Sequence, residues 1–182
     1  TRRSSDLTFF ATPSWIENHR SLAIQICQQG HEIQGLGEQA VCVEQMTAKA
    51  CRKELQKIRE TIGTVTEEPA VFFRIPGGEY NNEVLRTIYA CGSYPVAWSV
   101  DSMDWKEYEA SELVRQLLQS CTIRDGEILR FHGEGENTGE MVKLLHPRLK
   151  EEGYEAITVS QMVYKDRYRM TTDGRQIPEK SK

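Results

Sequence analysis

The chain has 182 residues, 38% of them apolar and 27% charged, which predicts one ordinary globular domain with enough chain for a full core. Its net charge is -4 and its basic residues are scattered among acids, so nucleic acids, membrane surfaces and anionic polymers are poor partners, while neutral or basic ligands remain allowed. No run approaches the ~18 apolar residues of a membrane span, and no stretch has the pattern of a signal peptide.

Apolar spacing and turn residues predict six strands that alternate with helices. The strands are expected at residues 7–12, 31–34, 70–74, 94–100, 127–131 and 156–159. The helices are expected at residues 13–29, 47–62, 80–91, 111–121 and 138–150, with a last helical turn after 160. Gly30 is the expected C′ residue of the first helix, residues 35–37 form a Gly-rich turn, and Ser111 and Ser160 are the expected N-caps. Residues 165–182 are polar and charged, and we expect them to form a loose tail after a domain of residues 1–164.

This alternation of strands and helices is typical of an α/β fold with a parallel sheet and right-handed connections. Periodicity leaves open whether the sheet is doubly wound or closed into a barrel. No GxGxxG or GxxxxGK[ST] motif opens a helix, and no G-x-S-x-G motif is present, so nucleotide binding and serine hydrolysis have no support. The five cysteines lack CxxC spacing and are expected to be mostly buried thiols, a Cys42–Cys51 bridge being the less favoured alternative.

Two strand ends carry residues of a ligand site. The apolar run at 70–74 stops at Arg74 and is followed by the tight turn Pro76-Gly-Gly78, while the next strand delivers Asp101, Asp104 and Trp105. Ligands of α/β folds bind at the carboxyl ends of the strands. These residues therefore indicate either a binding site or a structural ion pair between Arg74 and Asp101, and the residues alone favour neither.

Five motifs in register resemble the polysaccharide deacetylases, the NodB-homology group also called carbohydrate esterase family 4. The motifs are Thr8-Phe-Phe-Ala-Thr12, Gly30-His-Glu-Ile33, Arg74-Ile-Pro-Gly-Gly-Glu-Tyr-Asn81, Asp101-Ser-Met-Asp-Trp105 and Gly126-Glu-Ile-Leu-Arg-Phe-His132. The resemblance runs from about residue 7 to 163. It implies a distorted (β/α) barrel with its site at the carboxyl ends of the strands, and deacetylation of N-acetylated polymers such as chitin or peptidoglycan.

The resemblance also implies roles for single residues. In the family, an aspartate and two histidines hold a divalent metal, usually zinc, which activates a water for attack on the acetyl carbonyl. A second aspartate, oriented by an arginine, is the base, and another histidine protonates the leaving amine. By position, these roles fall on Arg74 (orienting arginine), Gly77 (oxyanion N–H), Asp101 (partner of the acid), Trp105 (pocket aromatic) and His132 (acid). Tyr80, Asp104 and Arg130 are expected to line the substrate groove. The plainer alternatives are a core position for Trp105 and a structural role for His132.

Several departures from the family pattern predict a loss of catalysis. Leu36 and Ala40 stand where the two metal histidines belong, and His31 occupies a structural position in its motif. The family's opening strand, which supplies the base and the third metal ligand, has no counterpart, and Arg130 replaces a leucine of the acetyl pocket. Without a metal, the pKa of the attacking water rises by roughly eight units, about 11 kcal/mol of nucleophile activation. We therefore expect no bound metal.

Three functions are compatible with the sequence. The favoured one is an inactive deacetylase-like domain that binds an N-acetylated glycan, with Trp105, Trp98 or Tyr80 stacking on a sugar ring and Arg74 and Asp101 holding its polar groups. The alternatives are an active metal-dependent de-N-acetylase with a rebuilt or incomplete site, and a protein-interaction role in envelope or spore assembly. All three imply a cell-envelope location.

Two structural expectations accompany these functions. A barrel that lacks one strand exposes two edges, which the tail after Tyr164, a partner chain or an upstream segment would cover. Arg74, without an aspartate base, is expected to pair with Asp101 or Asp104, with His132 within hydrogen-bond reach of the same cluster.

Overall fold

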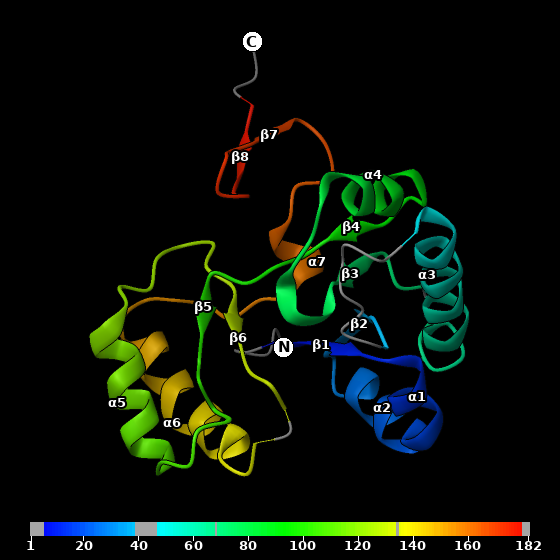
Figure 1. Ribbon diagram of the computed structural model, residues 1–182. Coiled ribbons are helices and arrows are strands. Elements are labelled where there is room, and N and C mark those ends of the chain that lie inside the picture. Colours follow the sequence, from blue (N-terminus) through cyan, green and yellow to red (C-terminus); the bar gives the residue numbers. More distant parts are fainter. Residues whose placement is uncertain (1–5, 39–46, 68, 134, 180–182) are drawn as a thin grey trace.

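The computed structural model describes residues 6–38, 47–67, 69–133 and 135–179 (Figure 1). Its first sheet has four parallel strands in the order β1 (Thr8–Ala11), β2 (Glu32–Leu36), β3 (Phe72–Arg74) and β4 (Tyr94–Pro95). A second sheet is the parallel pair β5 (Val100–Asp101) and β6 (Leu129–Arg130). An antiparallel hairpin, β7 (Tyr168–Met170) and β8 (Gln176–Pro178), lies close to the C-terminus.

The helices divide between the two parallel sheets. Those that accompany the first sheet are α1 (Pro13–Asn18), α2 (Arg20–Gln28), α3 (Ala48–Ile62) and α4 (Asn82–Ala90). Those that accompany the second sheet are α5 (Ala110–Ser120) and α6 (Thr138–Glu151), which pack on one another (Figure 1). A 3₁₀ turn, η2 (Pro76–Gly78), follows β3, and the short helix α7 (Val159–Met162) lies between the two groups. The predicted α/β alternation with parallel strands is confirmed.

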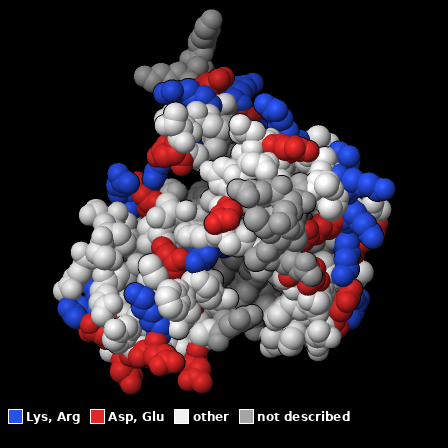
Figure 2. Space-filling model, viewed as in Figure 1, with Lys and Arg blue, Asp and Glu red and all other residues white. Residues whose placement is uncertain are grey.

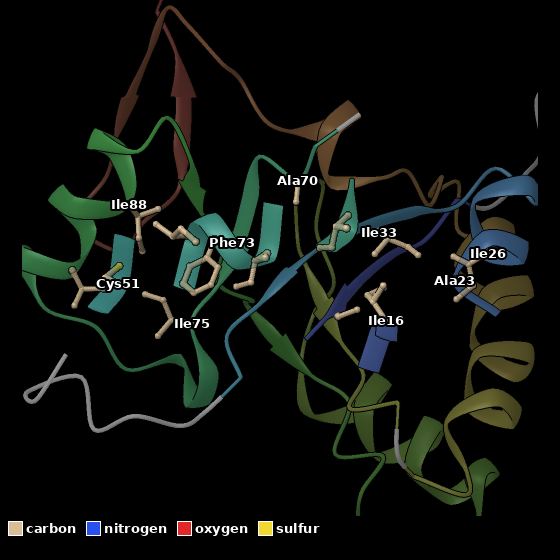
Figure 3. Close-up of a cluster of buried hydrophobic side chains, with 14 residues drawn as sticks. Ile16, Ala23, Ile26, Ile33, Cys51, Ala70, Phe73, Ile75 and Ile88 are labelled. Carbon is tan, nitrogen blue, oxygen red and sulfur yellow. The ribbon is translucent and has the colours of Figure 1, made fainter. Parts of the chain in front are cut away.

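Each group has its own hydrophobic core. Side chains of the first sheet and of α1 to α4 form the larger cluster, which includes Ile16, Ile33, Phe73 and Ile88 (Figure 3). The second cluster is made by β5, α5 and α6 around the fully buried Val114 and Met141. Helix α3 shows how the sequence builds the larger core. The Thr47 hydroxyl caps its first turn, and its buried residues Cys51, Leu55, Ile58 and Ile62 recur at helical spacing.

Strand β2 is longer than predicted, and the expected turn at residues 35–37 is wrong for Gly35 and Leu36. A Cβ atom on Gly35 would lie 2.5 Å from Ile58 Cγ2 of α3, so glycine at this position lets the helix pack closely on the strand. The side chain of Gln34 adds to the sheet, because its Oε1 accepts hydrogen bonds from the amides of Val71 and Phe72 at 3.0 and 2.9 Å.

The single strand predicted at 94–100 is two strands in two sheets. The amides of Tyr94 and Val96 donate to the carbonyls of Val71 and Phe73 on either side of Pro95, and the chain then leaves β4 and enters β5 only at Val100. The expected strand at 156–159 is also wrong. Only Ala156 makes a bridge, its carbonyl accepting from the amide of Asp6 at 3.2 Å. The two predicted serine caps are wrong as well, since Glu109 and Thr158 are the N-cap residues.

Helix α7 ties the chain's late residues to the first sheet. The amide of Val159 donates to Thr8 Oγ1 at 2.9 Å, and that hydroxyl donates to Glu32 at 2.7 Å. The amide and the hydroxyl of Ser160 also donate to the carboxylate of Glu32. The predicted cap residue Ser160 therefore satisfies an acid of β2 instead.

The expected loose tail after Tyr164 contains the β7–β8 hairpin up to residue 179. Arg175, just before β8, anchors it through an ion pair of 2.9 Å to Glu127, whose side chain is 5% exposed. The parallel strands of the described ranges form two sheets and no closed barrel, with β1 and β4 at the edges of the first. Within the same ranges, no helix has the length and apolarity to cross a membrane, and the four cysteines are free.

Candidate functional site

The carboxyl ends of the strands bring most of the predicted site residues together. Register places Leu36 opposite Arg74 at the ends of β2 and β3, and Asp101 opposite Arg130 at the ends of β5 and β6. His132 follows two residues after Arg130, just beyond the end of β6, and its Nε2 lies 2.8 Å from Arg130 Nη2.

Trp98 joins the two halves of the site. It lies in the segment between β4 and β5, so its indole reaches residues of both sheets. The Arg130 guanidinium stacks 3.6 Å from the Trp98 ring centre, and the Arg74 guanidinium lies 5.7 Å from it. Arg74 also stacks over the Phe10 ring at 3.9 Å. A sugar-stacking role for Trp98 is therefore disfavoured, because Arg130 covers it.

Four polar side chains form a connected cluster beside Trp98. Asp101 accepts a short hydrogen bond from Arg130 Nη2, forming an ion pair in which both side chains are 20% exposed. The same Nη2 atom lies 2.8 Å from His132 Nε2. On the far side of the imidazole, Nδ1 lies 2.7 Å from Asp104 Oδ1. The cluster thus runs from Asp101 through Arg130 and His132 to Asp104.

Asp104 is the buried end of this cluster, with only 1% of the residue exposed. Its carboxylate accepts from the Ser102 hydroxyl at 3.0 Å, from the His132 amide at 3.0 and 3.1 Å, and from the Thr138 hydroxyl. Burial raises the pKa of the Asp104 carboxyl, but the hydrogen bonds from Thr138, His132 and Ser102 outweigh it and hold that pKa below its usual range. Asp104 is therefore ionised at neutral pH.

An ionised Asp104 assigns the tautomer of His132. A carboxylate can only accept, so Nδ1 carries the hydrogen that it donates to Asp104. Nε2 of the neutral ring then has a lone pair, which accepts from Arg130 Nη2. The resemblance gave the role of histidine partner to Asp101, and the structure places Asp104 there instead.

The predicted ion pair of Arg74 with Asp101 or Asp104 is wrong. Strand register sets Arg130 directly opposite Asp101, and both oxygens of Asp104 already accept hydrogen bonds. Among the described residues, no carboxylate forms an ion pair with Arg74, and its buried Nε has no hydrogen-bond partner. Burial, with a smaller effect of the Arg130 charge, lowers the pKa of Arg74 to about 10. The expectation that His132 lies within reach of the cluster is confirmed.

The remaining predicted residues lie at the surface. Trp105 is 57% exposed and meets the His132 ring edge-on at 6.3 Å between ring centres, so its alternative as a core residue is wrong. Tyr80 is 55% exposed. Gly77 has a positive φ of 72° and open space beyond its Cα, whereas a Cβ on the neighbouring Gly78 would lie 2.6 Å from Trp98 Cη2.

The described residues do not fit a divalent metal. Leu36, half-buried at the end of β2, has no lone pair, and Ala40 falls outside the described ranges. Within those ranges, no group of three or more His, Cys, Asp or Glu side chains is arranged to hold a metal ion. His31 lies at the other end of β2, where its Nδ1 accepts from the Leu7 amide at 3.3 Å, in line with a structural position.

Sequence reasoning missed Ser102 and Thr138, which hold Asp104. Ser102 could have been suspected from the serine between two aspartates in Asp101-Ser-Met-Asp104. Thr138 begins α6 and has no local signal, because its partner lies 34 residues away. The contact between Arg130 and His132 had a signal in their i, i+2 spacing at the end of the strand expected at 127–131.

A family model for polysaccharide deacetylases matches residues 2–96. The chain belongs to this family. A peptidoglycan-N-acetylglucosamine deacetylase of Bacillus cereus is 25% identical over 87% of this chain and 76% of its own length. The Bacillus subtilis protein YlxY is 26% identical over 86% of this chain, and the deacetylase PgdA of Listeria monocytogenes is 26% identical over 88%. The chain spans 48% of the length of YlxY and 34% of PgdA.

Solved structures of the same family share the fold. A wild-type CE4 family pseudoenzyme from Bacillus anthracis matches with a TM-score of 0.79 at 23% identity, covering 87% of this chain and 57% of that one. A family 4 carbohydrate esterase from Streptomyces lividans matches with a TM-score of 0.77 at 19% identity, covering 97% and 85%. The fold class expected from the motifs is confirmed by these neighbours.

Proposed function

We propose that this deacetylase-like domain binds an N-acetylated glycan of the peptidoglycan or chitin type without cleaving its amide bond. The observation that carries this proposal is the 2.8 Å contact between Arg130 Nη2 and His132 Nε2. A histidine that protonates a leaving amine must present a proton on its free nitrogen. Here Nδ1–H is committed to Asp104, and the Nε2 lone pair accepts from a guanidinium.

The nucleophile side of the reaction supports the same proposal. The described residues do not fit a metal. No other described group near His132 takes over the activation of water that a metal would supply. We therefore assign no hydrolytic step to these residues. One structural neighbour, from Bacillus anthracis, is named a CE4 family pseudoenzyme, so this fold has a precedent for the loss of catalysis.

The groups that remain suit binding of a sugar. The exposed indole of Trp105 stands next to His132 and offers an apolar face to a pyranose ring. The Asp101–Arg130 pair, one-fifth exposed, can exchange hydrogen bonds with hydroxyl and amide groups. The names of the relatives from Bacillus cereus and Listeria monocytogenes, both peptidoglycan deacetylases, support peptidoglycan as the glycan and the cell envelope as the location.

The test combines binding with acetate release. The purified protein is titrated with chitotetraose and with soluble peptidoglycan fragments by calorimetry, and free acetate is measured in the same samples with and without added zinc. We expect saturable binding without acetate, and weaker binding by Trp105→Ala than by Tyr89→Ala, a similarly exposed aromatic on α4. Acetate release that a chelator abolishes would instead establish the alternative, an active metal-dependent de-N-acetylase.

Metal content gives an independent readout. Leu36 stands where the family pattern has a ligating histidine, so we expect no stoichiometric zinc, cobalt or nickel in the purified protein and no change of melting temperature with chelator. A metal near one per chain would contradict the proposal.

A further inference from the structure

The two arginines of the site differ in how their charges are balanced. Arg130 is paired with Asp101 and donates to His132. Arg74 makes no side-chain hydrogen bond or ion pair within the described ranges, although the residue is half-buried. Its neighbours are the rings of Phe10 and Trp98, and the Trp98 ring also carries the second cation, Arg130. A partly desolvated guanidinium in such surroundings is costly unless an anion accompanies it.

The carboxylates of the site are already used by other groups. Asp101 faces Arg130, and Asp104 is surrounded by donors from Ser102, His132 and Thr138. Turning either acid towards Arg74 would break contacts that the structure shows, so neither of these two acids is free to pair with Arg74.

We propose that Arg74 is the receptor for a carboxylate on the bound glycan, so that the site selects acidic N-acetylated sugars over neutral ones. This inference rests on the proposed glycan binding and specifies the class of sugar. Nε of Arg74 is buried, so Nη1 and Nη2 are the atoms that can reach a ligand. A carboxylate matches that fork with two parallel hydrogen bonds.

Arg74 and Arg130, the neighbour of His132 in the cluster, both contact the indole of Trp98. Arg74 ends β3 directly before the η2 turn, where Gly77 leaves open space. The lowered pKa of Arg74 agrees with this assignment, because a bound carboxylate would stabilise the charged form that burial and Arg130 now disfavour.

The ligand is a single carboxylate on a sugar and not a dense polyanion. Of the two arginines described in the site, only Arg74 lacks a carboxylate partner among the described residues, and the chain carries a net charge of -4. Figure 2 shows acidic and basic side chains interspersed over this face, with the basic ones most frequent over α3. Long-range attraction of a polyanion is therefore weak, which agrees with the exclusion drawn from composition.

The experiment compares two sugars that differ in one group. N-acetylmuramic acid and N-acetylglucosamine share ring and acetamide, and the acid adds a lactyl ether with a carboxylate. Affinities are measured for the wild type, for Arg74→Met and for the control Arg115→Met, which removes an exposed arginine of α5 paired with Glu112. We expect the wild type and Arg115→Met to prefer the acidic sugar by about tenfold to a hundredfold, and Arg74→Met to bind both sugars equally.

A second measurement separates this inference from the glycan proposal. Sodium lactate is titrated into protein labelled with ¹⁵N in its arginine side chains, and the Nε–H signal of Arg74 is expected to shift saturably. If lactate shifts the signal and neither sugar binds, the carboxylate receptor stands and the glycan proposal fails. If both sugars bind and the preference is absent or survives Arg74→Met, the receptor role is overturned while glycan binding stands. If neither lactate nor sugar has an effect, both are overturned.

Discussion

Arg130 Nη2 lies 2.8 Å from His132 Nε2, two residues further along the same chain segment. The same guanidinium is held by Asp101, its register partner across the β5–β6 pair. The guanidinium therefore lies against the nitrogen through which, by the family resemblance, His132 would act. Under the proposed function, this contact is what keeps His132 from donating a proton.

Arg130 and Arg74 differ in their predicted effect on stability. Arg130→Met leaves the carboxylate of Asp101, one-fifth exposed, without its partner and should lower the free energy of unfolding by about 1–3 kcal/mol. Arg74→Met leaves no described carboxylate unpaired and exchanges cation–π contacts for apolar packing, so it should stay within about 1 kcal/mol of the wild type. Urea denaturation midpoints measure both. Equal losses for the two variants would show that Arg74 has a structural ion pair.

Adjacent glycines provide a matched pair at the η2 turn. Both have positive φ, 72° for Gly77 and 79° for Gly78, so alanine should cost about 1 kcal/mol of backbone strain at either position. At Gly78 the new Cβ would also lie 2.6 Å from Trp98 Cη2, adding about 1–3 kcal/mol of overpacking. Thermal unfolding of Gly77→Ala and Gly78→Ala tests this. Identical melting temperatures would mean that Trp98 moves aside freely.

Asp104 should make stability depend on pH at the acid end. The pKa of its carboxyl is lower in the folded state than the usual value of about 4 in the unfolded chain. Its contribution is therefore fully present above pH ~4 and is lost as pH falls through the folded-state pKa. Asp104→Asn should be less stable than the wild type by about 1–3 kcal/mol at pH 7, with the difference shrinking below pH 4. Urea titrations at pH 7, 5 and 3 measure it, with the exposed Asp166→Asn as control. A difference that does not change with pH would contradict the assignment.

The tautomer of His132 can be observed directly. We expect long-range ¹H–¹⁵N spectra of the wild type at neutral pH to show hydrogen on Nδ1 and a lone pair on Nε2. Arg130→Leu should keep hydrogen on Nδ1, because Asp104 remains, and should shift the Nε2 resonance as its donor is lost. Hydrogen on Nε2 in the wild type would contradict the contact with Arg130.

The sequence was a sufficient guide to the fold class and to the place of the site. Strand–helix alternation predicted parallel strands, and their carboxyl ends do bring Arg74, Asp101, Asp104, Arg130 and His132 together. The pairing within the site could not be predicted, because it depends on register. Asp101 faces Arg130 only because Val100 aligns with Leu129, and no local pattern specifies that alignment.

Two other differences have plain physical causes. The apolar run at 94–100 has the composition of one strand, but the place where a backbone leaves one sheet for another depends on packing around Trp98. The hairpin after Tyr164 was hidden by its polar composition, although the Asp173-Gly174 dipeptide at its turn is a known hairpin signal.

The contacts of α7 have a consequence for synthesis on the ribosome. All four strands of the first sheet have been made once Pro95 has emerged, yet Glu32 meets Ser160 across 128 residues and Thr8 meets Val159 across 151. Contacts so distant in sequence form late, because the loop between them must close first. In a nascent chain that stops short of α7, Glu32 on β2 therefore lacks the donors of Ser160. The contacts between the first sheet and α7 can form only after residues 159 and 160 have left the exit tunnel.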